Sequence, residues 1–336
     1  MRVLITGGAG YIGSHTLLDI LEDGHDAFVI DNYDNSSPAV LDKVHALSNR
    51  QFSSEQASIL DASALDQIFA DFKPEAVIHF AGKKAVGESE QIPLDYYDTN
   101  FGGTVALLKA MDRHDCKIIV FSSSATVYGT PHYLPYDENH PLAPVNPYGR
   151  TKYFIENLIS DWANTSSDKS AMLLRYFNPV GAHSSGQIGE DPSGIPNNLM
   201  PYIAQVAIGK RQALQVFGND YDTRDGTGIR DYIHVTDLAK GHVAALHYAA
   251  THHGVEAVNL GTGNGVSVME MITAFETASG REIAFQICPR RAGDLPQFWA
   301  DSQKAQSLLG WQADKTIDDM CQDVWRWQSQ NPDGFA

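Results

Sequence analysis

The fold is decided by the stretch Thr6-Gly7-Gly8-Ala9-Gly10-Tyr11-Ile12-Gly13, which joins an apolar run, residues 2–6, to a helical pattern, residues 11–23. Its glycines fit both G-x-G-x-x-G and G-x-x-G-x-x-G. Side chains at these positions would block the tight turn, the approach of a pyrophosphate and the packing of helix on strand. The helix start adds free N–H groups and a partial positive charge, both of which favour phosphate. The stretch predicts a dinucleotide site; the alternative is a glycine-rich turn without a ligand.

An acidic residue indicates which dinucleotide binds. Asp31 ends the next predicted strand, residues 27–31, at close to the ~20 residues from the glycine motif that such sites show. A carboxylate there accepts hydrogen bonds from the ribose hydroxyls of NAD and repels the extra phosphate of NADP. Residues 31–35 contain no Arg or Lys to reverse that preference. We therefore expect NAD, and a comparable affinity for NADP would contradict this expectation.

Short apolar runs alternate with helix-length segments along the first half of the chain. Nearly continuous apolar runs are typical of parallel strands covered on both faces, and the alternation predicts βαβ units. We expect an α/β protein with a Rossmann-type, doubly wound parallel sheet. The predicted strands are residues 2–6, 27–31, 76–80, 117–121 and 171–176, and the predicted helices are residues 11–23, 62–72 and 100–114.

The alternation weakens after about residue 180. Residues 182–198 are rich in Gly, Pro, Ser and Asn, which is typical of a loop. At ~150 residues per domain, 336 residues favour two domains. We expect a nucleotide-binding domain at residues 1–180 and a smaller α+β substrate domain at 181–336, which includes a short strand near Val258. Residues 228–250 could instead pack back on the first domain.

Composition excludes several classes of function. Lys and Arg number 24 and Asp and Glu 41, so the net charge is −17, whereas a duplex-binding protein needs a basic surface. Three cysteines, Cys116, Cys288 and Cys321, are too few and too far apart for a disulfide framework or a zinc knuckle, and we expect no metal site. No apolar run approaches the ~18 residues of a membrane span, and a strand begins directly after Met1 without room for a signal peptide. We expect a cytoplasmic protein that binds neither nucleic acid nor membrane.

Two segments carry candidate catalytic residues. Ser124 follows the predicted strand 117–121, at the end of the sheet where open α/β folds bind ligands. Asn146 can cap a helix in which Tyr148 and Lys152 lie one turn apart on one face. The pKa of a phenol is ordinarily ~10, and a neighbouring ammonium together with an oxidised nicotinamide would favour its ionised form. Tyr148 could then remove a proton from a sugar hydroxyl, with Ser124 bonded to the same oxygen. The alternative, a Tyr and a Lys paired on an exposed helix face, is less favoured beside the glycine loop and the serine stretch.

Longer blocks of the chain carry a more specific signal. They are HFAG at residues 79–82, KAVGES at 84–89, LRYFNPVGAH at 174–183, GIPNNLMP at 194–201 and GIRDYIHV at 228–235. With the glycine loop, the serine stretch 122–129 and the segment 148–152, they resemble the extended short-chain dehydrogenase/reductase family. Within it they are similar to the UDP-glucose 4-epimerases, also called UDP-galactose 4-epimerases, over essentially the whole chain.

The resemblance implies an isomerase of galactose metabolism that interconverts UDP-galactose and UDP-glucose. Bound NAD takes a hydride from C4 of the sugar while Tyr148 takes the hydroxyl proton. The 4-keto sugar turns over in the site, and the hydride returns to the opposite face. The family also implies a homodimer, which no stretch of the sequence shows independently.

The resemblance further implies a set of binding residues. The cofactor contacts are Gly7, Gly10, Tyr11, Ile12, Gly13, Asp31, Asn32, Asn35, Ser36, Ser58, Ile59, Phe80, Ala81, Gly82, Lys84, Thr99, Tyr148, Lys152 and Phe177. The substrate contacts are Lys84, Ser124, Ala125, Thr126, Tyr148, Asn178, Asn198, Leu199, Gln215, Phe217, Arg230, Arg291, Asp294 and Phe298. A UDP pyrophosphate needs fixed cations, and the planar fork of Arg suits phosphate oxygens.

The chain departs from the family pattern at a few positions. Ser58 stands where the family usually has an aspartate, so the usual contact to the adenine amino group is in doubt, and Lys83 and Thr99 differ from the commonest residues at their places. Phe298 occupies a position that is bulky in some members and small in others. A bulky ring leaves little room for an N-acetyl group, so we expect a preference for UDP-glucose and UDP-galactose over their N-acetyl forms.

Two other functions remain open. A nucleotide-sugar 4,6-dehydratase must eliminate water, and resemblance to such enzymes would imply an acidic pair soon after the serine stretch. The chain has Ala125-Thr126-Val127 there. A cofactor-sensing regulator would need the glycine loop but has no use for Tyr148, Lys152 and Ser124 together.

Overall fold

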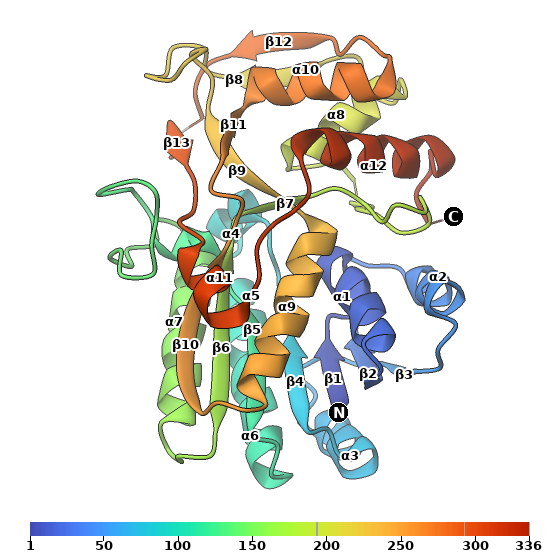
Figure 1. The fold of residues 1–336 in the computed structure, drawn as a ribbon, viewed down its shortest axis with the longest axis vertical. Helices are drawn as coiled ribbons and strands as arrows, with labels where there is room; N and C mark the ends of the chain where they lie inside the picture. The colour runs from blue at the N-terminus through green and yellow to red at the C-terminus, as the bar shows by residue number, and fades with distance from the viewer. Residues whose placement is uncertain (193, 292, 336) are drawn as a thin grey trace.

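The main layer is a seven-stranded sheet in a computed structural model that describes residues 1–192, 194–291 and 293–335 (Figure 1). The strand order is β10-β6-β5-β4-β1-β2-β3, and every neighbouring pair is parallel. The order reverses between β1 and β4, the kind of switch point at which such sheets bind ligands. The expected doubly wound sheet is confirmed. Its strands are β1 (Arg2–Thr6), β2 (Asp26–Asp31), β3 (Ser53–Gln56), β4 (Ala76–His79), β5 (Ile118–Ser122), β6 (Ser170–Tyr176) and β10 (Gly254–Leu260).

Helices cover both faces of this sheet. Successive residues of a strand point to opposite faces, so Val3 and Ile5 enter one hydrophobic core while Leu4 enters the other. The first core contains residues of α1, α2 and α9, and the second contains residues of α3, α6 and α7. These helices are α1 (Tyr11–Glu22), α2 (Ala39–Ser48), α3 (Ala62–Phe72), α6 (Gly103–Arg113), α7 (Pro147–Ala163) and α9 (Val235–Ala249).

The chain returns to the main layer late in the sequence. Helix α9 packs along α1, and β10 pairs with β6 as the edge strand of the main sheet. The run near Val258, which the sequence division assigns to the second domain, therefore belongs to the first layer. An edge strand whose first four residues are only half-buried has little apolar pattern to distinguish it.

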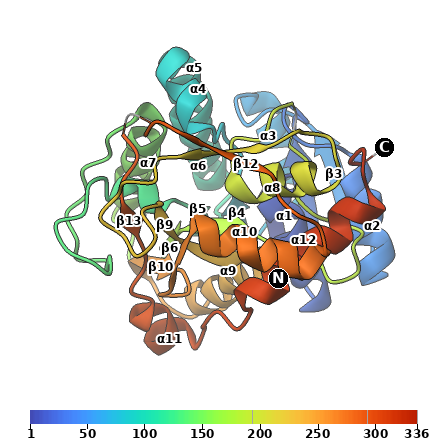
Figure 2. The ribbon, with the colours of Figure 1, turned by 90° about the horizontal axis from the view of Figure 1, so that it is seen from above.

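A smaller α+β layer lies beyond the carboxyl ends of the main strands (Figures 1 and 2). Strand β9 is central to it and pairs with β7, β11 and β13, while β8 pairs with β12. Residues of α8, α10 and α12 fill its core. The elements are β7 (Asn178–Val180), α8 (Leu199–Ala207), β8 (Leu214–Phe217), β9 (Ile229–His234), β11 (Gly265–Ser267), α10 (Val268–Ser279), β12 (Phe285–Cys288), β13 (Gln297–Phe298) and α12 (Ile317–Gln330).

Some elements have no clear sequence signal. All four residues of β3 are exposed, so the strand lacks alternation. The predicted helix 100–114 is a π-helical turn, Tyr97–Gly102, continued by α6. The described residues of the loop 182–198 include no helix or strand, as predicted.

The described residues also include three short α-helices: α4 (Val86–Gln91), α5 (Pro93–Tyr96) and α11 (Gln303–Leu309). Among the residues described, no helix has the length and apolar character to cross a membrane.

Candidate active site

The glycine loop has no room for side chains at three of its positions. Gly7 has a φ of +73°, and a Cβ atom there would lie 2.7 Å from the backbone nitrogen of Ala81. A Cβ atom on Gly13 would lie 2.2 Å from the Gly7 carbonyl oxygen, and one on Gly8 would lie 2.8 Å from the side chain of Val29. Such contacts are repulsive in a close-packed interior. The packing of α1 against β1 and β2 therefore requires glycine at these positions.

Gly10 differs from these three positions. A Cβ atom there would meet the Gly7 carbonyl oxygen at 3.2 Å and no side chain of the described residues. Gly10 is the N-cap of α1, which has neither a side-chain cap nor an acidic residue in its first turn. The first N–H groups of α1 are thus available to an anion. The loop fits the pyrophosphate of a dinucleotide.

Asp31 fastens this loop to the end of β2. Its buried carboxylate accepts hydrogen bonds from the backbone N–H groups of Ala9 and Tyr33, both at 2.9 Å, and from the Ser36 hydroxyl at 2.8 Å. A carboxylate has about four acceptor sites, which leaves capacity for a ribose hydroxyl. Ser36, itself a predicted cofactor contact, therefore orients the carboxylate that we expect to favour NAD over NADP.

Helix α7 carries the Tyr and Lys at the predicted spacing. The Asn146 side chain caps α7 by accepting a hydrogen bond from the Gly149 N–H at 2.8 Å. Tyr148 and Lys152 both lie on the buried face. The Lys152 ammonium donates to the Ser122 carbonyl oxygen at 2.8 Å and lies 5.9 Å from the centroid of the Tyr148 ring. The helix thus places both side chains against the end of β5.

Burial governs the proton affinities of this pair. It raises the pKa of Tyr148 far above its usual value; nearby Tyr176 adds to the rise, and a hydrogen bond with Ser124 opposes it. Burial also lowers the pKa of Lys152 to about 8, against the opposite effect of Glu156. The sequence led us to expect that the ammonium favours the phenolate. Desolvation is the largest influence of the protein's own groups on the Tyr148 pKa, and it favours the neutral phenol.

Ser124 is held as a hydrogen-bond donor toward the site. It is buried and caps a 3-10 turn, Ala125–Val127. Its hydroxyl oxygen accepts from the Thr126 N–H at 3.2 Å and from the Thr126 hydroxyl at 3.0 Å. Because the acceptor side of the oxygen is engaged, its own proton is free to be donated.

A buried charge pair that the sequence reasoning missed lies behind these residues. Glu156 follows Lys152 by one turn of α7, and its carboxylate accepts from the Ser123 hydroxyl at 2.5 Å. The Arg175 guanidinium donates to the same carboxylate from Nη2 at 2.7 Å and from Nε at 3.0 Å. The two side chains are 4% and 6% exposed. The pair fixes α7 to the ends of β5 and β6, and the signal that could have found it is an arginine inside an apolar strand.

Asn100 is a second residue that the sequence reasoning missed. It lies in the π-helical turn and accepts from the Lys83 N–H at 2.7 Å, while its amide donates to the Lys83 carbonyl at 3.0 Å. The same amide donates to the Thr151 hydroxyl on α7 at 3.2 Å. A Cβ atom on Gly82 would lie 2.8 Å from its side-chain oxygen. Asn100 therefore fixes the loop after β4 to the catalytic helix, and π-helical turns often occur at functional sites.

Several predicted substrate contacts lie together in the smaller layer. Arg230 of β9 pairs in register with Phe298 of β13, whose ring lies 4.9 Å from that of Phe177. The Arg291 guanidinium lies 4.7 Å over the Phe217 ring. Aromatic rings suit contacts with a base, and guanidinium groups suit a pyrophosphate.

Other predicted contacts pair with acidic residues. Arg291 donates to the Asp294 carboxylate at 2.9 Å. The Lys84 ammonium lies 3.6 Å from Glu190, which also accepts from the Asn198 amide at 3.2 Å. Gln215 is exposed on β8.

The remaining predicted contacts share one property: nearly all follow the carboxyl end of a strand. Tyr11 donates from its hydroxyl to the Gly181 carbonyl at 2.7 Å, which joins α1 to the chain after β7. Thr99 lies in the π-helical turn and Leu199 begins α8. The others are Asn32 and Asn35 after β2, Ser58 and Ile59 after β3, Phe80, Ala81 and Gly82 after β4, Ala125 and Thr126 after β5, and Asn178 after β6.

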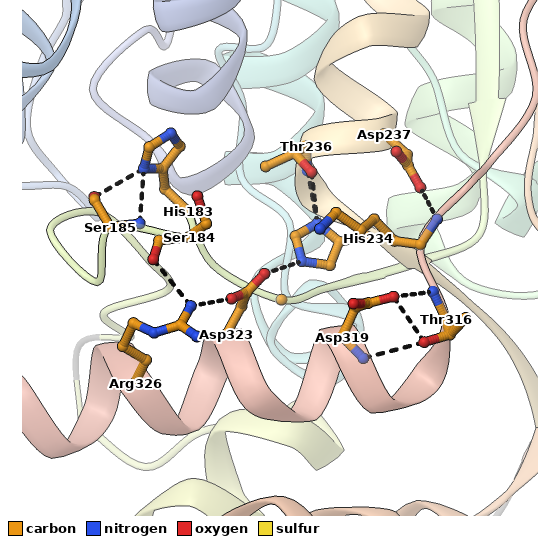
Figure 3. A network of polar contacts seen from close by, with 12 residues as sticks. His183, Ser184, Ser185, His234, Thr236, Asp237, Thr316, Asp319, Asp323 and Arg326 are labelled. Carbon is orange, nitrogen blue, oxygen red and sulfur yellow. Dashed lines mark hydrogen bonds and ion pairs between the residues drawn. The ribbon is translucent and has the colours of Figure 1, made fainter.

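A polar network joins the smaller layer to α9 (Figure 3). The wholly buried His234 ends β9 and caps α9, with Nδ1 accepting from the Thr236 N–H at 3.1 Å. Its Nε2 atom faces the Asp323 carboxylate of α12 at 3.3 Å. Asp323 also pairs with Arg326, which donates to the Ser184 carbonyl at 2.9 Å. The network fixes the end of β9, the strand that carries Arg230.

Comparisons with known proteins agree with this geometry. A family model described as GDP-mannose 4,6 dehydratase matches residues 4–324. The UDP-glucose 4-epimerase of Homo sapiens is 56% identical over 342 residues, covering 100% of this chain and 98% of its own length. That of Bacillus subtilis (strain 168) is 53% identical over 335 residues, covering 100% and 99%. The crystal structure of UDP-glucose 4-epimerase from Bifidobacterium longum in complex with NAD+ and UDP matches with a TM-score of 0.96 and 50% identity, covering 99% of this chain and 100% of that one.

Proposed function

Because the chain belongs to the UDP-glucose 4-epimerases, within the wider family that the GDP-mannose 4,6 dehydratase model describes, we propose that it interconverts UDP-galactose and UDP-glucose. One observation carries the proposal: the Tyr148 phenol is buried beside the Ser124 hydroxyl and the Lys152 ammonium, at the same end of the sheet as the glycine loop. A sensor of the cofactor would need the loop alone.

The residues at the switch point fit NAD. The start of α1 would hold the pyrophosphate, and Asp31 the adenosine ribose. Bound NAD+ would supply the oxidant for C4 of the hexose, return the same hydrogen to a 4-keto sugar, and place a positive charge beside Tyr148. Since the reaction has no net redox change, the chain must keep its cofactor between turnovers.

Tyr148 is proposed as the base that takes the C4 hydroxyl proton and later returns it. Ser124 donates a hydrogen bond to the reacting oxygen or to the phenolate, which stabilises developing negative charge. Lys152 is anchored on the Ser122 carbonyl, so its charge is held at a constant distance from the phenol.

Lys152→Met tests the role of this charge. Without the ammonium the phenolate loses an electrostatic partner, so the pKa that governs the base should rise and turnover at pH 7 should fall on the order of 10²-fold. The measurement is kcat against pH for wild type and variant. An unchanged pH profile would contradict the role given to Lys152.

The substrate is proposed to be a UDP-hexose without an N-acetyl group. Arg230 and Arg291 would bind the pyrophosphate, and Phe217, under the Arg291 guanidinium, would contact the uracil. The Phe298 ring packs 5.1 Å from Tyr136 and 4.9 Å from Phe177, so it cannot swing away freely. It therefore limits the space beside the sugar.

Phe298→Ala is expected to increase the ratio of kcat/KM for UDP-N-acetylgalactosamine to that for UDP-galactose by at least about tenfold. The variant opens volume beside the hexose and leaves the catalytic helix intact. Equal turnover of the acetylated and plain substrates by the wild type would refute the steric argument.

A homodimer is proposed from the exposed apolar residues around α5 and α7. Leu94 is 79% exposed, and Phe154 and Val86 are 43% and 41% exposed. Helices α4 and α5 pack against α7, and the rings of Tyr97 and Phe154 lie 6.2 Å apart, so the elements that carry these side chains adjoin. Leu94→Asp should shift the sedimentation of the protein toward a monomer, whereas an unchanged mass would place the interface elsewhere.

Purified protein incubated with UDP-galactose and no added cofactor separates three functions. Formation of UDP-glucose supports the epimerase. A 4-keto-6-deoxy sugar would identify a 4,6-dehydratase, although Ala125-Thr126-Val127 offers that reaction no carboxylate. An unchanged substrate, in protein that contains NAD, would favour the cofactor sensor.

A further inference from the structure

Three side chains of types that often bind metals lie together at the amino end of the main sheet, away from the proposed catalytic residues. Asp23 and His25 lie in the turn between α1 and β2, and His247 lies in the last turn of α9. One oxygen of Asp23 lies 2.9 Å from Nε2 of His25 and 2.6 Å from Nε2 of His247. All three potential ligand atoms lie within 4.8 Å of one another. The packing of α9 on α1 brings together residues that are more than 200 positions apart, which is why spacing along the sequence predicts no metal site.

Hydrogen bonds satisfy this cluster incompletely. The contact of His247 with Asp23 is a hydrogen bond. His25 Nε2 faces the same oxygen at 2.9 Å, but this buried atom has no well-aligned hydrogen bond among the described residues. A buried ring nitrogen that is poorly hydrogen-bonded is costly. A cation between the three groups would satisfy both ring nitrogens and the carboxylate at once.

The distances between the three potential ligand atoms suit a small transition metal ion. Zn²⁺ binds imidazole and carboxylate at about 2.0–2.2 Å in tetrahedral geometry, which places neighbouring ligand atoms about 3.3 Å apart. From 2.9 Å and 2.6 Å, the His25 and His247 nitrogens must therefore move away from the Asp23 oxygen by about 0.4 Å and about 0.7 Å. The His247 side chain is 52% exposed and that of Asp23 36%, so both can adjust, and solvent can supply a fourth ligand.

The charges near the cluster are mixed, and burial raises the pKa of Asp19 to about 7. The last turns of α1 contain Asp19 and Glu22 and no basic residue. Asp19 has a buried carboxylate oxygen without a hydrogen-bond partner among the described residues. Positive groups also lie nearby: Lys240 on α9 lowers the pKa of Asp19, and the Met1 nitrogen lies 3.0 Å from Nδ1 of His25.

We propose that Asp23, His25 and His247 form a binding site for one divalent transition metal ion of the Zn²⁺ class. Two imidazoles and a carboxylate are ligands that suit Zn²⁺, Ni²⁺ and Cu²⁺ better than Mg²⁺ or Ca²⁺. The ion would link the end of α1 to the end of α9. Because β2 begins at Asp26 and the catalytic residues lie at the carboxyl ends of the strands, the site is separate from the proposed chemistry.

Isothermal titration of the tag-free, chelator-treated protein with ZnCl₂ tests the proposal, with His247→Ala as the main variant and His252→Ala as the matched control. His252 is exposed near the same helix end but lies outside the cluster. We expect the wild type and His252→Ala to bind one equivalent that His247→Ala loses or binds at least about tenfold more weakly. Absence of that equivalent in the wild type, or its survival in His247→Ala, would overturn the proposal.

Asp23→Asn and Co²⁺ provide independent readouts. Asp23→Asn keeps a hydrogen-bonding side chain at an exposed position, so it should fold while binding the metal at least about tenfold more weakly. Co²⁺ in the wild-type site should give the visible absorption of a four-coordinate ion, and this band should be absent from His247→Ala. A Co²⁺ spectrum that is identical in both proteins would place the metal elsewhere.

Discussion

Tyr148→Phe is expected to reduce the turnover of UDP-galactose on the order of 10³-fold while the protein keeps its NAD. The substitution removes one oxygen atom from a side chain that is 6% exposed, so the packing of α7 should change little. The reaction, however, loses the only group that we place to take the C4 hydroxyl proton. The measurements are kcat and the NAD released from the denatured protein.

Tyr153→Phe is the control for this variant. Tyr153 lies on the same helix and is half-buried, with its ring 5.7 Å from that of Phe154, and we give it no catalytic or binding role. It should keep kcat within a factor of about two. If Tyr148→Phe also kept most of its activity, another group would have to move the proton, and the account of the site would be wrong.

Glu156→Gln is expected to lower the free energy of unfolding by about 3–5 kcal/mol. The substitution leaves the Arg175 guanidinium, 6% exposed, without its carboxylate, and an uncompensated buried charge is strongly destabilising. It also removes an ionised acceptor from Ser123, the residue before Ser124. At a temperature where the variant is folded, kcat should fall while the KM for UDP-galactose changes little. Denaturant unfolding and steady-state kinetics give the two quantities.

Glu256→Gln provides the comparison with an exposed pair. Glu256 lies 2.7 Å from Lys304, and the two side chains are 37% and 33% exposed. Exposed pairs contribute about 0–1 kcal/mol, so this variant should hardly change the free energy of unfolding.

Arg175→Met combined with Glu156→Gln should lower the free energy of unfolding by less than the sum of the two single substitutions, because the pair is then removed as a unit. Equal effects of Glu156→Gln and Glu256→Gln would contradict the positioning role of Glu156.

Sequence patterns predict those strands, helices and caps that depend on interactions between residues close together in the chain. Residues 2–6 and 62–72 are predicted with the bounds that β1 and α3 have, since apolar runs, prolines and glycines act over a few residues. The Asn146 cap and the one-turn spacing of Tyr148 and Lys152 are local in the same way, and both are present on α7. The glycine loop is predictable because its glycines keep a fixed spacing between one strand and the next helix.

Features that depend on distant segments could not be predicted in this way. The Glu156–Arg175 pair and the contact of Asn100 with Thr151 form only when the sheet brings three segments together. The placement of β10 in the main sheet depends on its pairing with β6, for which its half-buried sequence carries little pattern. The high pKa that burial gives Tyr148 is likewise a property of the folded protein, because desolvation depends on the segments packed around the phenol.

The fate of the C4 hydrogen tests the proposed chemistry most directly. UDP-galactose labelled with deuterium at C4 is incubated with the wild-type protein in ordinary water, and the UDP-glucose formed is examined by mass spectrometry and NMR. The account predicts that essentially all the label stays at C4, because the same hydrogen leaves the carbon as a hydride and returns to its other face. Loss of the label to water would show that C4 is inverted by proton exchange with solvent, and would contradict transient oxidation of the sugar.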